Sequence, residues 1–170
     1  MIKKWVFSII TVLTVMVLSA CGKSLDEQIE LGVANSQAVF EEAPQEPNHT
    51  VGAIEVFLPA GYTIEESEDK ANYLLKKDNQ EYILFVNSNE QKNSELLYEL
   101  FKQNSGKQII KEQTVKTDNE FGFTAIVLND DDTYELIVNS GNVKISTLSN
   151  DHNIDQKLVD MTKIARSVSL

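Results

Sequence analysis

Cys21 is the only cysteine among the 170 residues of the chain. A disulfide within one chain is therefore impossible, and burial of apolar side chains has to stabilise whatever fold the chain adopts. The cysteine directly follows a long apolar stretch, residues 5–18, which holds 14 residues without a charge. Its position therefore indicates a role that depends on the N-terminal segment.

The first 20 residues have the layout of a secretory signal. Lys3 and Lys4 precede the uncharged run, which is shorter than the roughly 20 apolar residues that a membrane-spanning helix needs. A basic start, a short apolar stretch and small residues before a cleavage point are typical of such signals. A buried core helix would show a polar face, and this run has none. We therefore expect residues 1–20 to be a signal peptide that the mature protein lacks.

The sequence Leu18-Ser19-Ala20-Cys21 resembles the lipobox of bacterial lipoproteins at each of its four positions. The resemblance implies that a diacylglycerol is attached to the thiol of Cys21, that the chain is cut before this residue, and that the new amino group can also be acylated. Two acyl chains hold a protein stably on a membrane. The alternative is an ordinary signal cut near Ala20, which leaves a free thiol. The resemblance thus implies a lipid anchor at the extracytoplasmic face of the cell membrane.

The net charge excludes some partners. The chain has a formal net charge of −11, and loss of the signal, which takes two lysines and no acidic residue, leaves −13. Such an excess of acidic groups opposes binding to nucleic acid, which requires neutralisation of phosphates. It also opposes flat contact with an anionic lipid surface, which attracts basic segments. We expect no nucleic-acid partner and a domain that stands off the bilayer.

Residues 21–50 differ in pattern from the rest of the chain. Ser24 and Glu27 fit a capping box, and apolar residues at near-helical spacing follow them. Two prolines, Pro44 and Pro47, then indicate a stiff linker. We expect residues 21–50 to be a lipid anchor and tether that includes a short amphipathic helix over residues 25–42. This segment serves as a spacer or docks in a groove of a partner protein.

From residue 51 onward, runs of alternating apolar residues separated by turn residues predict a globular domain, residues 51–170. Residues 82–86 and 121–128 are apolar on both faces, so we expect both strands to be central and covered on both sides. The predicted order is ββββαββββα, and short turns make neighbouring strands antiparallel. The fold class is therefore α+β, with a twisted, mainly antiparallel sheet and helices packed on its faces. The predicted strands are residues 53–58, 62–66, 72–77, 81–87, 108–116, 121–129, 134–139 and 143–148, and the predicted helices are residues 93–106 and 153–168.

The same order of elements resembles the α/β/α sandwich of PsbP/Mog1-type domains. The resemblance includes a strand followed by Pro-x-Gly-aromatic at residues 58–62 and a closing helix. Members of this group mostly assist or bind other proteins, and they share no catalytic residues that could be transferred to this chain. The resemblance implies a binding module, by analogy of fold alone.

Few residues suggest site chemistry. His49 and His152 lie in no metal-binding or catalytic motif, and a catalytic site needs several converging groups. Residues 129–133 contain three consecutive aspartates, whereas a calcium loop alternates its ligands and contains a glycine. A polar hairpin turn explains that segment better. We therefore expect no catalytic residue, no bound metal and no cofactor, with Cys21 as the one modified residue.

Three classes of function remain open. The first is a binding or assembly module of the bacterial cell envelope that engages an envelope protein. The second is a receptor for a small ligand or cation, serving a transporter, and the third is an enzyme, for which no nucleophile–base pair is visible. An exposed apolar patch would favour the first class, and a deep pocket with converging polar groups would favour the second.

Overall fold

The computed structural model describes residues 23–103, 106–130, 133–150 and 152–170. Residues 1–22, which include the predicted signal and Cys21, lie outside this part of the chain. The helices and strands of the described residues are α2 (Leu25–Glu41), β1 (His49–Val51), β2 (Ile54–Val56), β3 (Tyr62–Glu66), β4 (Asn72–Lys77), β5 (Gln80–Val86), α3 (Leu96–Gln103), β6 (Gln108–Lys116), β7 (Phe121–Asp130), β8 (Thr133–Ser140), β9 (Val143–Ser149) and α4 (Ile154–Ser167).

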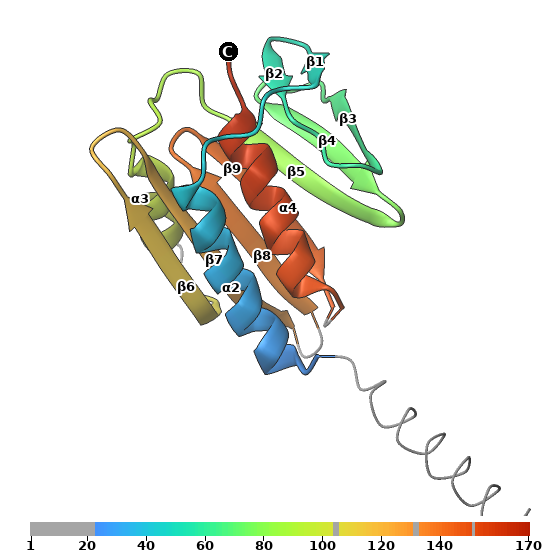
Figure 1. Ribbon diagram of the computed structural model, residues 1–170, viewed down its shortest axis with the longest axis vertical. Coiled ribbons are helices and arrows are strands. Elements are labelled where there is room, and N and C mark those ends of the chain that lie inside the picture. The colour runs from blue at the N-terminus through green and yellow to red at the C-terminus, as the bar shows by residue number, and fades with distance from the viewer. Residues whose placement is uncertain (1–22, 104–105, 131–132, 151) are drawn as a thin grey trace, which may run out of the picture.

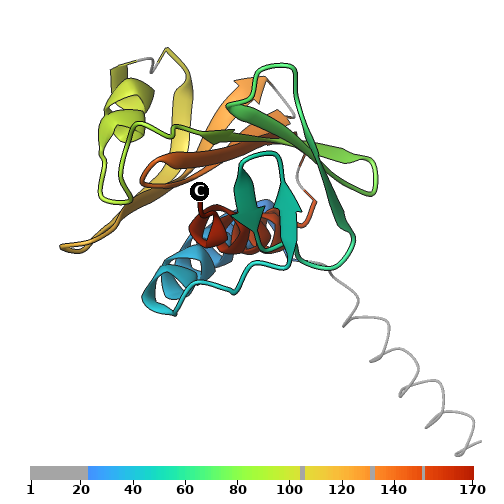
Figure 2. The same ribbon diagram turned by 90° about the horizontal axis from the view of Figure 1, so that it is seen from above.

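A twisted seven-stranded antiparallel sheet, in the order β3-β4-β5-β9-β8-β7-β6, is the centre of the molecule (Figure 1). Helices α2 and α4 lie side by side on one face, here called the inner face, and α3 lies on the opposite, outer face (Figure 2). The predicted α+β class, with a mainly antiparallel sheet and helices on its faces, is confirmed.

Two apolar clusters hold these layers together. The larger one fills the space between the inner face and helices α2 and α4, and it includes Leu158 and Met161, whose exposed fraction is 0%. The smaller one lies between β7 and α3, where Tyr98 and Phe101 cover Phe121 and Phe123. The spacing of apolar residues in the last predicted helix therefore identified its buried face correctly.

The predicted tether is wrong for most of its length. Helix α2 begins with the predicted cap, in which the Ser24 hydroxyl accepts a hydrogen bond from the Glu27 amide. Its residues Ile29 and Val33 belong to the larger apolar cluster, and α2 packs along α4. Gly32, which weakens a helix, allows this approach, since a Cβ there would lie 2.9 Å from Leu158 Cδ1. Residues 25–41 are therefore part of the globular body, and the domain begins before residue 51.

Two expectations about the sheet also need correction. The first predicted strand lies in a separate two-stranded sheet, β1-β2, which is joined to the C-terminus by a bridge between Glu55 and Ser169. The outer face of strand β5 is only partly covered, because Ile83, which points to this face, is 46% exposed and Phe85 is half-buried. Apolar residues on both faces thus indicate a central strand, but they do not guarantee a helix over each face. The same expectation is correct for β7, whose residues 121–127 are all buried.

The start of α4 differs from the predicted cap. Asn153 precedes the helix, but its backbone is left-handed, with a φ of 56°, and its side chain makes no capping hydrogen bond. The amide of Ile154 instead donates to Oε1 of Gln28 at 3.1 Å. A side chain from the first turn of α2 therefore holds the N-terminus of α4 in place.

Candidate functional site

The outer face of the sheet is only partly covered. Helix α3 has eight residues, and its rings contact β7, with 5.2 Å between the ring centroids of Tyr98 and Phe123 and of Phe101 and Phe123. In the part of the chain that the structure describes, no helix lies over the outer face of β4, β5 and β9 (Figure 2). This side of the sheet is thus open to solvent.

Hydrogen bonds from two α3 side chains fix the position of this helix. Tyr98 donates its hydroxyl proton to Oε1 of Glu112 at 2.7 Å, and Lys102 Nζ lies 2.9 Å from Oε2 of the same carboxylate. Burial raises the pKa of Glu112, but the hydrogen bonds from Lys102 and Tyr98 outweigh this and hold the pKa below its usual value. These contacts therefore hold helix α3, which borders the open area, in a fixed position on the sheet.

Apolar side chains lie along the open area. Leu148 is 53% exposed, Ile83 is 46% exposed, and Leu100, on the bordering helix α3, is 44% exposed. Two adjoining hollows, of about 350 and 520 Å³, share Glu135 and extend from α3 to β5. We call this surface the outer groove, and its defining residues are Ile83, Leu97, Leu100, Glu135, Ile137, Lys144 and Leu148.

Charged groups of both signs surround the apolar residues of the outer groove. Lys107 Nζ lies 2.8 Å from Oε2 of Glu135. Among the described residues, Lys144 forms no ion pair, although it lines the groove. An apolar surface with a charged rim is the usual composition of a surface that binds another protein. The outer groove is therefore a candidate docking surface for a polypeptide.

A third hollow, of about 980 Å³, lies at the end of the body where α2 and α4 begin. We call it the α4 cleft. Its lining includes the paired rings of Tyr62 and Tyr82, whose centroids are 5.4 Å apart. Gly61, with a φ of 87°, turns the chain just before Tyr62. Burial raises the pKa of both tyrosines, so their hydroxyl groups stay protonated.

The buried carboxylate of the α4 cleft, Asp160, has two partners. Lys77 Nζ lies 3.0 Å from Oδ2, and Gln156 Nε2 donates to Oδ1 at 2.8 Å. Lys77 also lies over the Tyr62 ring, with Nζ 4.8 Å from the ring centroid. These contacts join β4 to α4 and give the cleft a polar, hydrogen-bonding wall.

The residues singled out in the sequence do not converge. Cys21 lies outside the described residues, so its lipidation stays a prediction. His49 lies in β1, where its Nδ1 is 2.7 Å from Oδ1 of Asn48, and His152 lines the α4 cleft. Asp130 pairs with Thr133 in the β7–β8 hairpin, as the polar-turn interpretation predicts. Within the described ranges, no group of three or more potential metal ligands is found, and no helix is long and apolar enough to cross a membrane.

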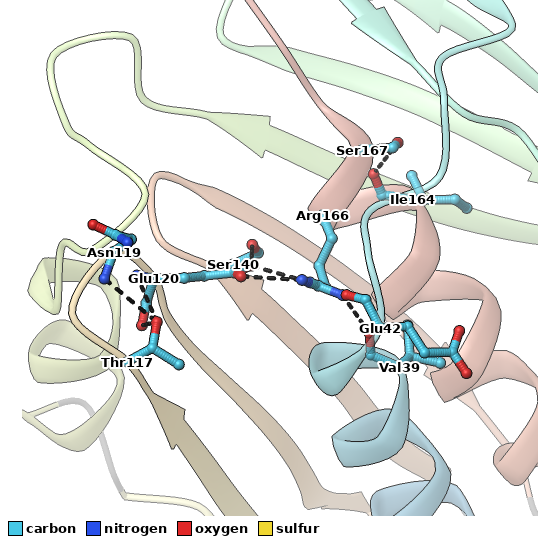
Figure 3. Close-up of polar contacts among 9 residues, drawn as sticks. All are labelled: Val39, Glu42, Thr117, Asn119, Glu120, Ser140, Ile164, Arg166 and Ser167. Atoms are coloured by element: carbon cyan, nitrogen blue, oxygen red, sulfur yellow. Dashed lines mark hydrogen bonds and ion pairs between the residues drawn. The ribbon is translucent and has the colours of Figure 1, made fainter.

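Sequence patterns missed one buried ion pair. Arg166, the only arginine of the chain, contacts Glu120 from the last turn of α4 (Figure 3). Glu120 is held in place by the β6–β7 turn, where Thr117 Oγ1 accepts a hydrogen bond from its amide at 3.1 Å. The single arginine among many lysines is the one signal that could have marked this position, because arginine suits buried ion pairs.

No protein-family model and no curated protein matches the chain. A similar solved structure is the solution structure of cyanobacterial PsbP (CyanoP) from Synechocystis sp. PCC 6803, with 11% identity and a TM-score of 0.47, over 75% of this chain and 94% of that chain. Because the TM-score is below 0.5, this likeness carries no argument about the chain. We take no function, partner or site residue from it.

Proposed function

We propose that the protein is a membrane-anchored lipoprotein of the bacterial cell envelope that binds a protein partner without catalysis. The observation that carries this proposal is the outer groove, in which Ile83 and Leu148 are about half exposed beside a short helix that leaves them uncovered. Adjoining exposed apolar side chains in a concave surface are typical of a site that another protein covers.

The groove also indicates the chemistry of the partner. Its apolar residues would accept a strip of apolar side chains, such as one face of an amphipathic segment. Lys144 lines the groove and forms no ion pair within the described residues, so a carboxylate on the partner would complement it. The partner is therefore a polypeptide segment that carries apolar side chains next to an acidic residue.

The lipobox resemblance supplies the anchor of this proposal. Three residues, 22–24, separate Cys21 from the start of α2 at Leu25. A chain of this length reaches at most about 14 Å, far less than a tether that extends to residue 50 could reach. An acylated Cys21 would therefore hold the body close to the headgroups. Such tethering raises the effective concentration of the protein for a membrane-bound partner.

A charge introduced into the groove tests the proposal. In the full-length protein, Leu148→Asp and Ile83→Asp should each abolish binding to a partner identified by crosslinking, because a carboxylate would have to be buried in the interface. Both side chains are exposed, so the melting temperature should change little. The matched control is Gln37→Asp, because Gln37 is an exposed residue of α2, on the opposite side of the sheet from the outer groove. Binding unchanged in both groove variants would contradict the proposal.

One observation favours a second function. The α4 cleft brings together polar side chains from several elements, as the sites of small-ligand receptors do. A receptor for a small ligand is therefore the alternative to a purely protein-binding module.

A further inference from the structure

The α4 cleft differs in charge from the rest of the chain. The chain has a formal net charge of −11, but the charged residues that line the cleft balance each other, apart from the histidine. They are the lysines Lys23, Lys77 and Lys157 and the aspartates Asp78, Asp155 and Asp160. Lys23 pairs with Asp155, and Lys77 pairs with Asp160. Lys157 and Asp78 take part in neither of these two ion pairs.

Lys157 has no carboxylate partner among the residues that the structure describes. Its Nζ donates to the hydroxyl oxygen of Ser149 at 2.7 Å, and it forms no ion pair with any residue that the structure describes. Burial lowers its pKa, since its ammonium group is partly withdrawn from water. Binding of an anion would compensate this lost hydration. An ammonium group has three protons, so Lys157 keeps two donors for such an anion.

Two further groups can donate hydrogen bonds into the cleft. At the N-terminus of α4 the Asn153 side chain makes no capping hydrogen bond, and the Ile154 amide donates to Gln28 Oε1. The next amides of this first turn have no partner within the helix, so they can donate to a ligand. Tyr62 is only 6% exposed, and its hydroxyl group makes no hydrogen bond of ordinary geometry in the part of the chain described, although Tyr82 and Asp160 lie close to it. A buried hydroxyl without a partner is unfavourable. A ligand oxygen in the cleft would satisfy it.

We infer that the α4 cleft binds a phosphate-bearing group, with Lys157, the N-terminus of α4 and the Tyr62 hydroxyl as its donors. A phosphate presents several acceptor oxygens in different directions, which matches donors that come from separate elements. Helix N-termini bind phosphates through their free amides and the helix dipole. Because Asp78, Asp155 and Asp160 also line the cleft, a group with a single negative charge, such as a phosphodiester, is preferred to a dianion.

Two sources could supply this group. One is a free phosphate-bearing small molecule, and the other is the headgroup of a membrane lipid. Lys23 lines the cleft and is two residues from Cys21, so the lipid source rests on the proposed anchor. Binding of a soluble phosphate does not depend on the anchor, and it can be tested whether or not Cys21 is acylated.

The test is a titration of the full-length protein in detergent micelles with two probes, inorganic phosphate and the soluble headgroup analogue glycerophosphoglycerol. Chemical shifts of the backbone amides in residues 152–157 report binding in the cleft. We expect saturable shifts in this segment with at least one probe. Tighter binding of glycerophosphoglycerol assigns the site to a lipid headgroup, and tighter binding of inorganic phosphate assigns it to a free phosphate.

Variants separate a ligand role from a structural one. Lys157→Gln should weaken binding roughly tenfold or more, the effect of losing a hydrogen bond to a charged group. Lys163→Gln removes the same charge from α4 outside the cleft lining, and it should bind as wild type does. Tyr62→Phe should weaken binding roughly three- to tenfold with little change in the melting temperature, since this hydroxyl makes no protein hydrogen bond of ordinary geometry. Absence of saturable shifts with both probes, or equal affinity of wild type and Lys157→Gln, would overturn the inference.

Discussion

Arg166 and Glu120 form a two-point ion pair between the last turn of α4 and the residue that precedes β7. Nε lies 3.0 Å from Oε1 and Nη2 lies 3.1 Å from Oε2, and the arginine side chain is only 4% exposed. The Nη1 atom also donates to the backbone oxygens of Val39 and Glu42, at the end of α2 (Figure 3). One side chain thus joins both inner helices to the edge of the sheet.

Loss of this arginine should destabilise the protein strongly. Arg166→Met should lower the free energy of unfolding by about 3–5 kcal/mol, the range for breaking a buried ion pair. Denaturant unfolding measures the change. Lys163→Met, in the same helix, is the control and should cost well under half as much, because Lys163 forms no ion pair with any described residue. A cost below about 1 kcal/mol for Arg166→Met would show that the ion pair is not a structural link.

The contact between α2 and β7 predicts a second effect. A Cβ on Gly122 would lie 2.5 Å from the ring of Phe40 and 2.8 Å from the backbone oxygen of Asn139. Gly122→Ala should therefore cost about 1–3 kcal/mol by overpacking. At Gly106 a Cβ would meet no atom within 4 Å, so Gly106→Ala is the matched control. Equal stability of the two variants would mean that α2 does not pack on the sheet.

A pH effect should follow from the contact of α3 with β6. The pKa of Glu112 is below its usual value of 4.5, because hydrogen bonds from Lys102 and Tyr98 outweigh the effect of burial. A carboxylate with a lowered pKa contributes stability above its unfolded-state pKa and loses it as the pH falls toward the folded-state value. Glu112→Gln should therefore be less stable than wild type near neutral pH, by about 1–3 kcal/mol. The two stability curves should converge below pH 4.5. A constant difference down to the acid limit would contradict the titration of this group.

The sequence was informative wherever local pattern and burial agree. Alternation predicted the strands of the main sheet, and the spacing of Leu158 and Met161 identified the buried face of α4. The antiparallel pairing of Asp130 with Thr133 is what the polar-turn interpretation of this segment predicts. These features depend on neighbouring residues along the chain, and for that reason a single sequence can show them.

The features that sequence reasoning missed depend on residues far apart in the chain. In the sequence, Gly32 indicates only a less stable helix α2. The structure shows that the missing Cβ leaves room for Leu158 to pack against the helix. The ion pair of Arg166 with Glu120 joins positions 46 residues apart, and the α4 cleft is lined from four separate segments of the chain. Likewise, the exposure of Ile83 depends on where α3 ends on the outer face. Periodicity contains no information on such contacts.

The proposed anchor makes a prediction of its own. Labelled fatty acid should be incorporated into the wild-type protein and not into Cys21→Ala, because the thiol is the only one in the chain. The variant should also accumulate as an uncleaved precursor, since cleavage in the lipoprotein pathway follows lipid attachment. Ser24→Ala, three residues further on, is a control that should be labelled like wild type. Equal labelling of the wild-type protein and Cys21→Ala would contradict the anchor.

The most direct test of the proposed function is site-specific photo-crosslinking in intact cells. A photoreactive side chain at Leu148, in the outer groove, is compared with one at Gln37, on the exposed side of α2. We predict one discrete membrane-associated protein adduct from position 148 that is absent from position 37. The adduct should be weakened by Lys144→Glu, which reverses the charge in the groove. No adduct at position 148, or the same adducts from both positions, would contradict the account.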